Sequence, residues 1–123
     1  MRGEKICLQA TEIMDYTSAL ERTGGDIDFL QELLDLYGKN FDEKKKFLAK
    51  AIQEKNFCLI QDLGHSLKGS SANLSLNSLK KASSQLEAAA REKDMDEVKR
   101  SFALLEKEFR RFQDFLHDLA PED

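Results

Sequence analysis

One short stretch of the chain carries the side chains best suited to chemistry. Read at about 100° per residue, residues 62–74 form a helix with leucines on one face and His65 almost opposite them. An exposed imidazole is largely neutral near pH 7, so one ring nitrogen can act as a nucleophile. Lys68 follows one turn later and places a cation beside it. A nucleophile with a neighbouring cation suits phosphoryl transfer, which depends mainly on positioning and charge stabilisation.

Two glycines flank this histidine inside the same predicted helix. Gly64 and Gly69 each cost about 1 kcal/mol relative to alanine in a helix interior. One interpretation is clearance: glycine lets a partner surface approach His65, and Gln61 and Ala72 share that docking face. The other is close packing against a second helix, or a turn that breaks the helix here. The sequence leaves both interpretations open.

The motif resembles the signature of histidine-containing phosphotransfer (HPt) domains, in which a histidine is followed by a lysine three residues on, a glycine and then small residues. In this chain it reads His65-Ser66-Leu67-Lys68-Gly69-Ser70-Ser71. The similarity continues upstream through Gly25-Asp26 and downstream through Gln85-Leu86-Glu87, and it covers roughly residues 15–116. The resemblance therefore extends over most of the chain.

Members of this family carry phosphoryl groups between other signalling proteins, and the resemblance implies the same role here. His65 would be the phosphorylated residue, Lys68 its electrostatic neighbour, and Gly69 would keep the approach open. The implied partners are a histidine kinase or hybrid sensor kinase and the receiver domain of a response regulator. The receiver supplies an aspartate and a bound Mg²⁺, so this chain is expected to hold no cofactor and no metal.

The resemblance also indicates a partner for the histidine on the next helix. Glu87 stands where the family often has a glutamine or glutamate that faces the histidine, and such a carboxylate would accept from Nδ1–H and leave Nε2 free. Arg91, one turn beyond, is then a candidate phosphoryl contact. The alternative for both residues is an ordinary i,i+4 surface pair. The chain departs from the family at Ser75, where the turn between the two helices usually has a glycine.

Composition predicts one all-α domain. The chain has 123 residues, of which one is proline and six are glycine, and 41% are hydrophobic. We expect an antiparallel up-down-up-down four-helix bundle with a short extra N-terminal helix. A net charge of −4 gives no support to nucleic-acid binding, and no apolar run is long enough to span a membrane. Two cysteines without metal-site spacing favour a reducing, cytoplasmic setting, and the family resemblance implies a monomer.

The expected elements follow from caps and hydrophobic spacing. Residues 1–11 are predicted to form a tail and residues 12–120 the bundle, with helices over residues 12–22, 26–55, 57–73, 76–93 and 94–119. Gly24 and Gly25 are expected to end the first helix, and Asp26, Asn56 and Ser75 to cap the helices that follow them. The second helix carries a seven-residue apolar pattern, which comprises Ile27, Leu30, Leu34, Tyr37, Phe41, Leu48 and Ala51.

Lys44 is the one misfit in that apolar pattern, and it begins the run Lys44-Lys45-Lys46. Such a run can form a basic patch, but a solvated helix face is the favoured interpretation. The last helix shows the clearest stripe in the chain, at steps of three and four residues. That stripe comprises Val98, Phe102, Leu105, Phe109, Phe112, Leu116 and Leu119.

Three other functional readings compete with a phosphotransfer module. The first is a helical-bundle adaptor without chemistry, and the second is the amino-terminal phosphoacceptor module of a chemotaxis-type histidine kinase. The third is a metal-binding bundle, which the Asp62-x-x-His65 spacing invites. That site needs inward-facing ligands on paired helices, whereas these side chains face outward and a second motif is missing. Independent kinase activity is disfavoured, because the chain has no glycine-rich phosphate-binding loop.

Overall fold

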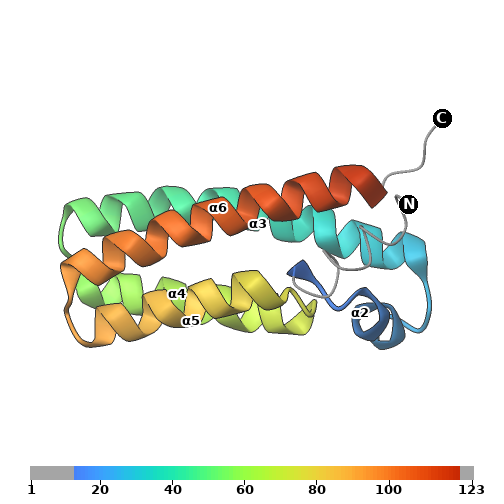
Figure 1. Cartoon of the computed structure of the whole chain (residues 1–123), viewed down its shortest axis with the longest axis horizontal. Coiled ribbons are helices and arrows are strands. Elements are labelled where there is room, and N and C mark those ends of the chain that lie inside the picture. Colours follow the sequence, from blue (N-terminus) through green and yellow to red (C-terminus); the bar gives the residue numbers. More distant parts are fainter. Residues whose placement is uncertain (1–12, 120–123) are drawn as a thin grey trace.

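The computed structural model describes residues 13–119, and these residues form helices without strands (Figure 1). Of these, α2 is a short helix over Tyr16–Arg22. The four long helices are α3 (Ile27–Gln53), α4 (Phe57–Asn73), α5 (Asn77–Arg91) and α6 (Met95–Leu119). The expected all-α fold is confirmed, while the predicted tail over residues 1–11 lies outside the described residues. None of the described helices is long and apolar enough to cross a membrane.

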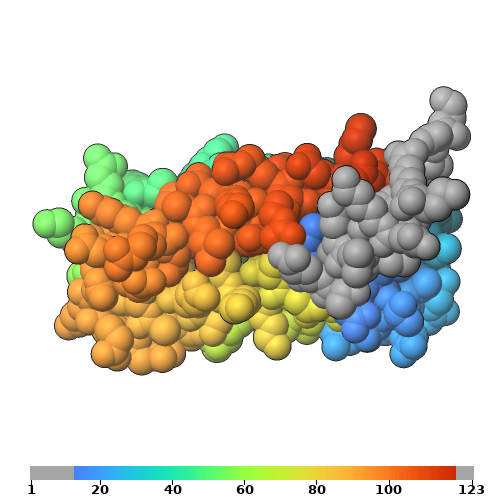
Figure 2. All heavy atoms as spheres, in the orientation of Figure 1, coloured from blue at the N-terminus to red at the C-terminus, as the bar shows by residue number. Residues whose placement is uncertain are grey.

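The four long helices form an antiparallel bundle, because each short turn reverses the direction of the chain. In Figure 1, α3 and α6 lie in one layer and α4 and α5 in the other, with α2 at one end of the bundle. Figure 2 shows α5 and α6 lying against each other along the face turned to the viewer. The hairpin of α4 and α5 has the most extensive contact between helices, so these two elements fix the surroundings of residues 60–90.

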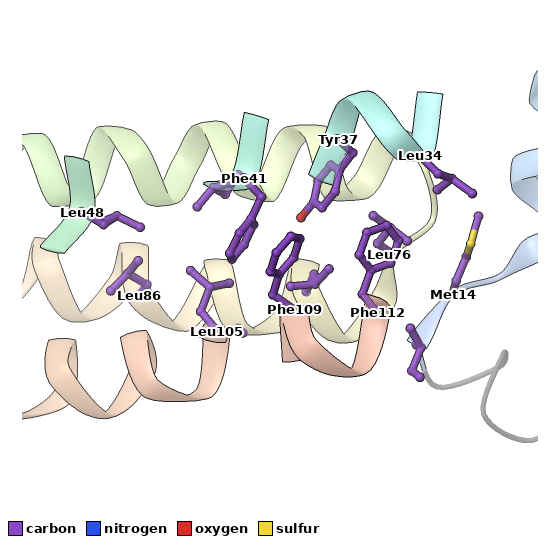
Figure 3. Close-up of a cluster of buried hydrophobic side chains, with 14 of the residues drawn as sticks. Met14, Leu34, Tyr37, Phe41, Leu48, Leu76, Leu86, Leu105, Phe109 and Phe112 are labelled. Atoms are coloured by element: carbon purple, nitrogen blue, oxygen red, sulfur yellow. The ribbon is translucent and has the colours of Figure 1, made fainter. Parts of the chain in front are cut away.

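Aromatic side chains from α3 and α6 meet in the centre of the bundle (Figure 3). The rings of Phe41 and Phe109 stack with their centroids 3.9 Å apart, and Tyr37 meets Phe112 edge to face at 5.4 Å. These four residues belong to the apolar stripes predicted for the two helices, and all four are buried. Ile27 is the exception in the α3 stripe, because 58% of it is exposed at the first position of the helix.

Side-chain caps start most of the helices, as the sequence predicts. Asp26 accepts a hydrogen bond from the amide of Phe29, Asn56 from that of Leu59, and Asp94 caps α6 in the same way. The helix predicted over residues 12–22 is present as α2 from Tyr16 onward, because Asp15 accepts from the amide of Ser18 and serves as its N-cap.

The three turns between the long helices share one geometry. Each preceding helix is followed by a residue with left-handed backbone, and these residues are Lys55, Ser75 and Lys93 at φ values of 54°, 56° and 56°. In each turn the next amide donates to the carbonyl five positions back, at 2.8–3.0 Å, which is the Schellman arrangement. Gly24 takes the corresponding position after α2, at φ 70°. The same type of turn therefore follows each of the described helices α2 to α5.

The prediction that Ser75 caps α5 is wrong. Its φ of 56° places it in the left-handed position that follows α4, and the N-cap of α5 is Leu76, which forms no side-chain cap hydrogen bond. Ser75 therefore occupies the position at which glycine avoids a steric cost. Its carbonyl also accepts from the amide of Asp15 at 2.9 Å, so this turn holds the segment that precedes α2.

Replacing Ser75 with glycine should stabilise the protein. A non-glycine residue with left-handed backbone costs about 1–2 kcal/mol, and the greater freedom of glycine in the unfolded chain cancels part of the gain. We expect the free energy of unfolding, measured by urea denaturation, to rise by about 0.5–1 kcal/mol. Ser75→Ala is the matched control, because it keeps the Cβ atom and should not stabilise. Equal stability of the two variants would contradict this account of the turn.

Candidate functional site

The helix that carries the predicted nucleophile is held firmly at its C-terminal half. The hydroxyl groups of Tyr37 and Ser71 are hydrogen-bonded across the core at 2.7 Å, which joins α3 to α4. At the end of α4 the guanidinium of Arg22 donates to the carbonyls of Ala72 and Asn73, at 2.8 and 2.9 Å. These carbonyls lie in the last turn of α4, beyond its regular i+4 hydrogen bonds, so a cation from α2 both caps and fixes the helix.

His65 lies on the outer face of α4, as the helical spacing predicts, and 70% of its side chain is exposed. Its Nδ1 atom lies 2.9 Å from Oε2 of Glu87 on α5. Glu87 is nearly inaccessible, with only 8% of its side chain exposed. The predicted contact between the two helices is therefore present, and it pairs an exposed ring with a buried carboxylate.

Glu87 gathers two cations as well as the imidazole. The ammonium of Lys68 lies 2.8 Å from Oε1, and the guanidinium of Arg91 lies 3.6 Å from Oε2. The hydrogen bond from Lys68 is the main cause that holds the pKa of the Glu87 carboxyl below its usual range, with the bond from His65 adding to it against the effect of burial. The carboxylate is therefore ionised at neutral pH.

This geometry assigns the ring nitrogens of His65 their roles. An ionised carboxylate only accepts hydrogen bonds, so Nδ1 must carry a proton and donate it to Glu87. In the neutral ring the other nitrogen, Nε2, then keeps a free lone pair. The arrangement is an oriented nucleophile on an exposed surface, with Lys68 and Arg91 beside it. Among residues 13–119, no group of three or more histidine, cysteine or acidic residues could hold a metal ion.

The two glycines beside His65 have different surroundings. Gly64 is buried, and a Cβ atom placed on it would lie 3.1 Å from the backbone nitrogen of Glu87 and 3.3 Å from its Cα. The expectation that Gly64 lowers a docking surface is therefore wrong, because it lets α4 approach the backbone of α5. Gly69 is exposed, and a Cβ there would meet nothing within 4 Å. Gln61 and Ala72 are half-buried on the same helix.

Alanine at the two glycines should change stability in opposite directions. Gly69→Ala should raise the free energy of unfolding by about 1 kcal/mol, because it improves helix propensity and meets no neighbour. Gly64→Ala gains the same propensity but forces its methyl group against the α5 backbone, an overpacking that costs about 1–3 kcal/mol. We therefore expect Gly64→Ala to be less stable than Gly69→Ala by about 1–3 kcal/mol in thermal or urea denaturation. Equal stability would contradict the packing role of Gly64.

The sequence missed two features next to this site. The ammonium of Lys44 on α3 donates to the hydroxyl of Ser66 at 2.6 Å, although its lysine run predicts a solvated face. An apolar groove of about 460 Å³ also lies where α2, α3 and α4 meet. Phe29 and Leu36 line it and remain about half exposed. The apolar pattern of α3 marks only the side chains that face the core. Phe29 and Leu36 lie outside that pattern, so no signal in the sequence marked the groove.

The comparisons with known proteins agree on one family. The family model described as the Hpt domain matches residues 32–118. Among solved structures, histidine-containing phosphotransfer protein B of Pseudomonas aeruginosa PAO1 matches with a TM-score of 0.79 at 22% identity, covering 85% of this chain and 91% of that chain. A search of curated proteins finds no match.

Two plant structures share the fold. A putative histidine-containing phosphotransfer protein from rice matches with a TM-score of 0.79 at 18% identity, covering 93% of this chain and 89% of that chain. ZmHP2, a histidine-containing phosphotransfer protein from maize, matches with a TM-score of 0.74 at 23% identity, covering 93% of this chain and 94% of that chain.

Proposed function

Because the chain belongs to the Hpt domain family, we propose that it is the phosphotransfer module of a two-component phosphorelay and that His65 carries the phosphoryl group. The observation that carries this proposal is the hydrogen bond between His65 Nδ1 and the buried carboxylate of Glu87. It directs Nε2 outward on an exposed ring, which is where another protein's active site can reach it. An adaptor without chemistry has no use for this arrangement.

The proposed reaction is a reversible exchange between His65 and an aspartate of a receiver domain. The Nε2 lone pair attacks the phosphorus of the aspartyl phosphate, the P–O bond to the aspartate breaks, and its electron pair restores the carboxylate. The phosphorylated ring keeps its Nδ1 proton, which Glu87 holds, so this chain needs no separate base. Mg²⁺ is expected on the receiver, and this chain contributes no cofactor to the proposal.

Lys68 and Arg91 are proposed to offset the charge of the phosphoryl group. Both lie within 4 Å of Glu87 in the unphosphorylated protein, and both are partly exposed, so each can turn toward an anion on His65. Charge-assisted hydrogen bonds of this kind are about twice as strong as neutral ones. The shared carboxylate keeps the two cations close to the ring before the phosphoryl group arrives.

The receiver is proposed to dock on the outer face of α4. Gly69 leaves the backbone bare on that face, and Gln61 and Ala72 are half-buried on the same helix. The neighbouring groove offers exposed apolar side chains, which on a small protein mark surfaces for partners. We propose that the chain acts as a monomer in the cytoplasm, the compartment in which histidine kinases use ATP.

The direct test is incubation with a receiver domain that carries a labelled aspartyl phosphate. Label should move to this chain in the presence of Mg²⁺ and return when unphosphorylated receiver is added in excess. A histidine kinase with labelled ATP is the parallel donor, and it reports the direction from which phosphate arrives. If no receiver or kinase tested transfers label to this chain, the result would favour a helical-bundle adaptor without chemistry.

A further inference from the structure

The cations that flank His65 on the α5 side are already shared with an acid. Lys68 and Arg91 both contact the carboxylate of Glu87, so the three groups together leave a single uncompensated positive charge. A phosphoryl group on a side chain adds negative charge and three oxygens that accept hydrogen bonds. Both cations are already bound to Glu87 before that group arrives, so its oxygens can take a further cationic donor.

A further cation stands on the opposite side of His65. Lys44 of α3 reaches across to α4 and donates to the hydroxyl of Ser66, the residue next to His65, at 2.6 Å. The other two lysines of the run have different surroundings. Lys45 forms an ion pair with Glu106 at 3.4 Å, and Lys46 is exposed. Among the residues that the structure describes, Lys44 lies within 4 Å of no acidic oxygen. The acid nearest along α4 is Asp62, which is exposed one turn before Ser66.

The position of Lys44 in α3 explains why it points this way. It falls between Phe41 and Leu48, which are both buried, and takes a place where the seven-residue pattern calls for an apolar side chain. A lysine there must run its aliphatic stem along the seam between α3 and α4 and bring its charge out at the surface. The ammonium emerges at Ser66, beside the candidate phosphoacceptor.

We propose that Lys44 is a second phosphoryl-binding cation, which leaves the Ser66 hydroxyl and turns to the phosphoryl group once His65 is modified. This inference rests on the proposed function of His65 and adds a residue from α3 to its site. A neutral hydroxyl is a weak partner for an ammonium group, and a phosphoryl dianion a strong one. Lys44 and the cations beside Glu87 then approach the oxygens of the group from opposite sides.

The ionisation of the phosphoryl group itself is the cleanest readout, since it needs no partner protein. Potassium phosphoramidate can load the chain: Nε2 attacks phosphorus, the P–N bond of the reagent breaks, and its nitrogen leaves as ammonia with the protons it already carries. A cation at about 4 Å in water favours the dianion about fivefold. Lys44→Met should therefore raise the pH at which the phosphoryl group loses its last proton, followed by ³¹P NMR, by about 0.7.

Three further variants separate charge from structure. Lys46→Met removes the same charge two positions along α3 and should leave the ³¹P titration at its wild-type position. Lys44→Arg keeps the charge and should restore most of the shift. Ser66→Ala removes the resting hydrogen-bond acceptor but leaves the cation, so it should also titrate like wild type. If Lys44 only braced α4, Ser66→Ala and Lys44→Met would behave alike, and that result would overturn the inference.

The outcome separates this inference from the proposed function. Suppose that the wild-type chain takes up phosphate on His65 and that the ³¹P titrations of Lys44→Met and Lys46→Met coincide. The role of Lys44 is then refuted while the phosphotransfer function stands. An effect of Lys44→Met that appears only in transfer from a receiver also refutes it, because that pattern indicates a docking contact. Failure of wild-type His65 to accept phosphate from phosphoramidate, kinase or receiver would remove both.

Discussion

Replacing His65 with glutamine should abolish phosphate incorporation from a receiver or a kinase. Glutamine keeps the approximate length and polarity of histidine, but its amide nitrogen has no free lone pair for attack on phosphorus. The side chain is exposed, so the substitution removes no core contact and the variant should fold. We expect phosphate incorporation to fall to background. The free energy of unfolding should stay within about 0.5 kcal/mol of the wild-type value, as is usual for surface substitutions.

The chemistry of the label provides an independent check. A phosphoryl group on an imidazole nitrogen is labile to acid and stable to base, whereas an aspartyl phosphate is destroyed by base. His117 is the other histidine of the chain and is exposed near the end of α6, which makes His117→Gln the matched control. That variant should incorporate phosphate normally. Retention of acid-labile label in His65→Gln would exclude His65 as the acceptor.

Hydrophobic spacing and cap residues were sufficient to predict the helices, because both act locally. Asp26 and Asn56 cap α3 and α4 as predicted, since each side chain can reach the amide three residues on. The same reasoning failed at Ser75, which does not cap α5. Serine is a good cap in isolation, but the carbonyls at the end of α4 are satisfied by a Schellman turn that requires left-handed backbone at this position. The choice is made by the connection between two helices rather than by the residue alone.

The site shows the same division between local and tertiary information. The exposure of His65 and the place of Lys68 follow from helical periodicity. The purpose of Gly64 depends on the α5 backbone that packs against it, so the sequence could only pose the alternatives. The contact of Lys44 with Ser66 spans two helices and breaks the apolar pattern, and its lysine run carried the opposite signal. Features that depend on the packing of helices were the ones that the sequence left open or missed.

Removing the Glu87 carboxylate should have the second-largest effect on transfer. Glu87→Ala deletes the acceptor that holds Nδ1–H and the carboxylate to which Lys68 and Arg91 are bound. The imidazole can then rotate and exchange its proton between the two nitrogens. Partners that orient a metal-binding histidine are typically worth about 10–100-fold in activity, and we expect a loss of similar size here in the rate of transfer from a receiver.

Glu87→Gln distinguishes orientation from charge. Its amide oxygen can still accept from Nδ1–H, so the ring stays oriented, and the rate should fall less than in Glu87→Ala.

The stability of wild type and Glu87→Gln in acid also tests the charge of the Glu87 carboxylate. Because the pKa of the Glu87 carboxyl is lowered on folding, its contribution to stability is present above the usual carboxyl range and is lost as the pH falls through the folded value. Wild type should therefore lose stability in acid relative to Glu87→Gln. Equal transfer rates for Glu87→Ala and wild type would show that Glu87 does not position His65, and a parallel acid response of wild type and Glu87→Gln would show that its carboxylate is not preferentially ionised in the fold.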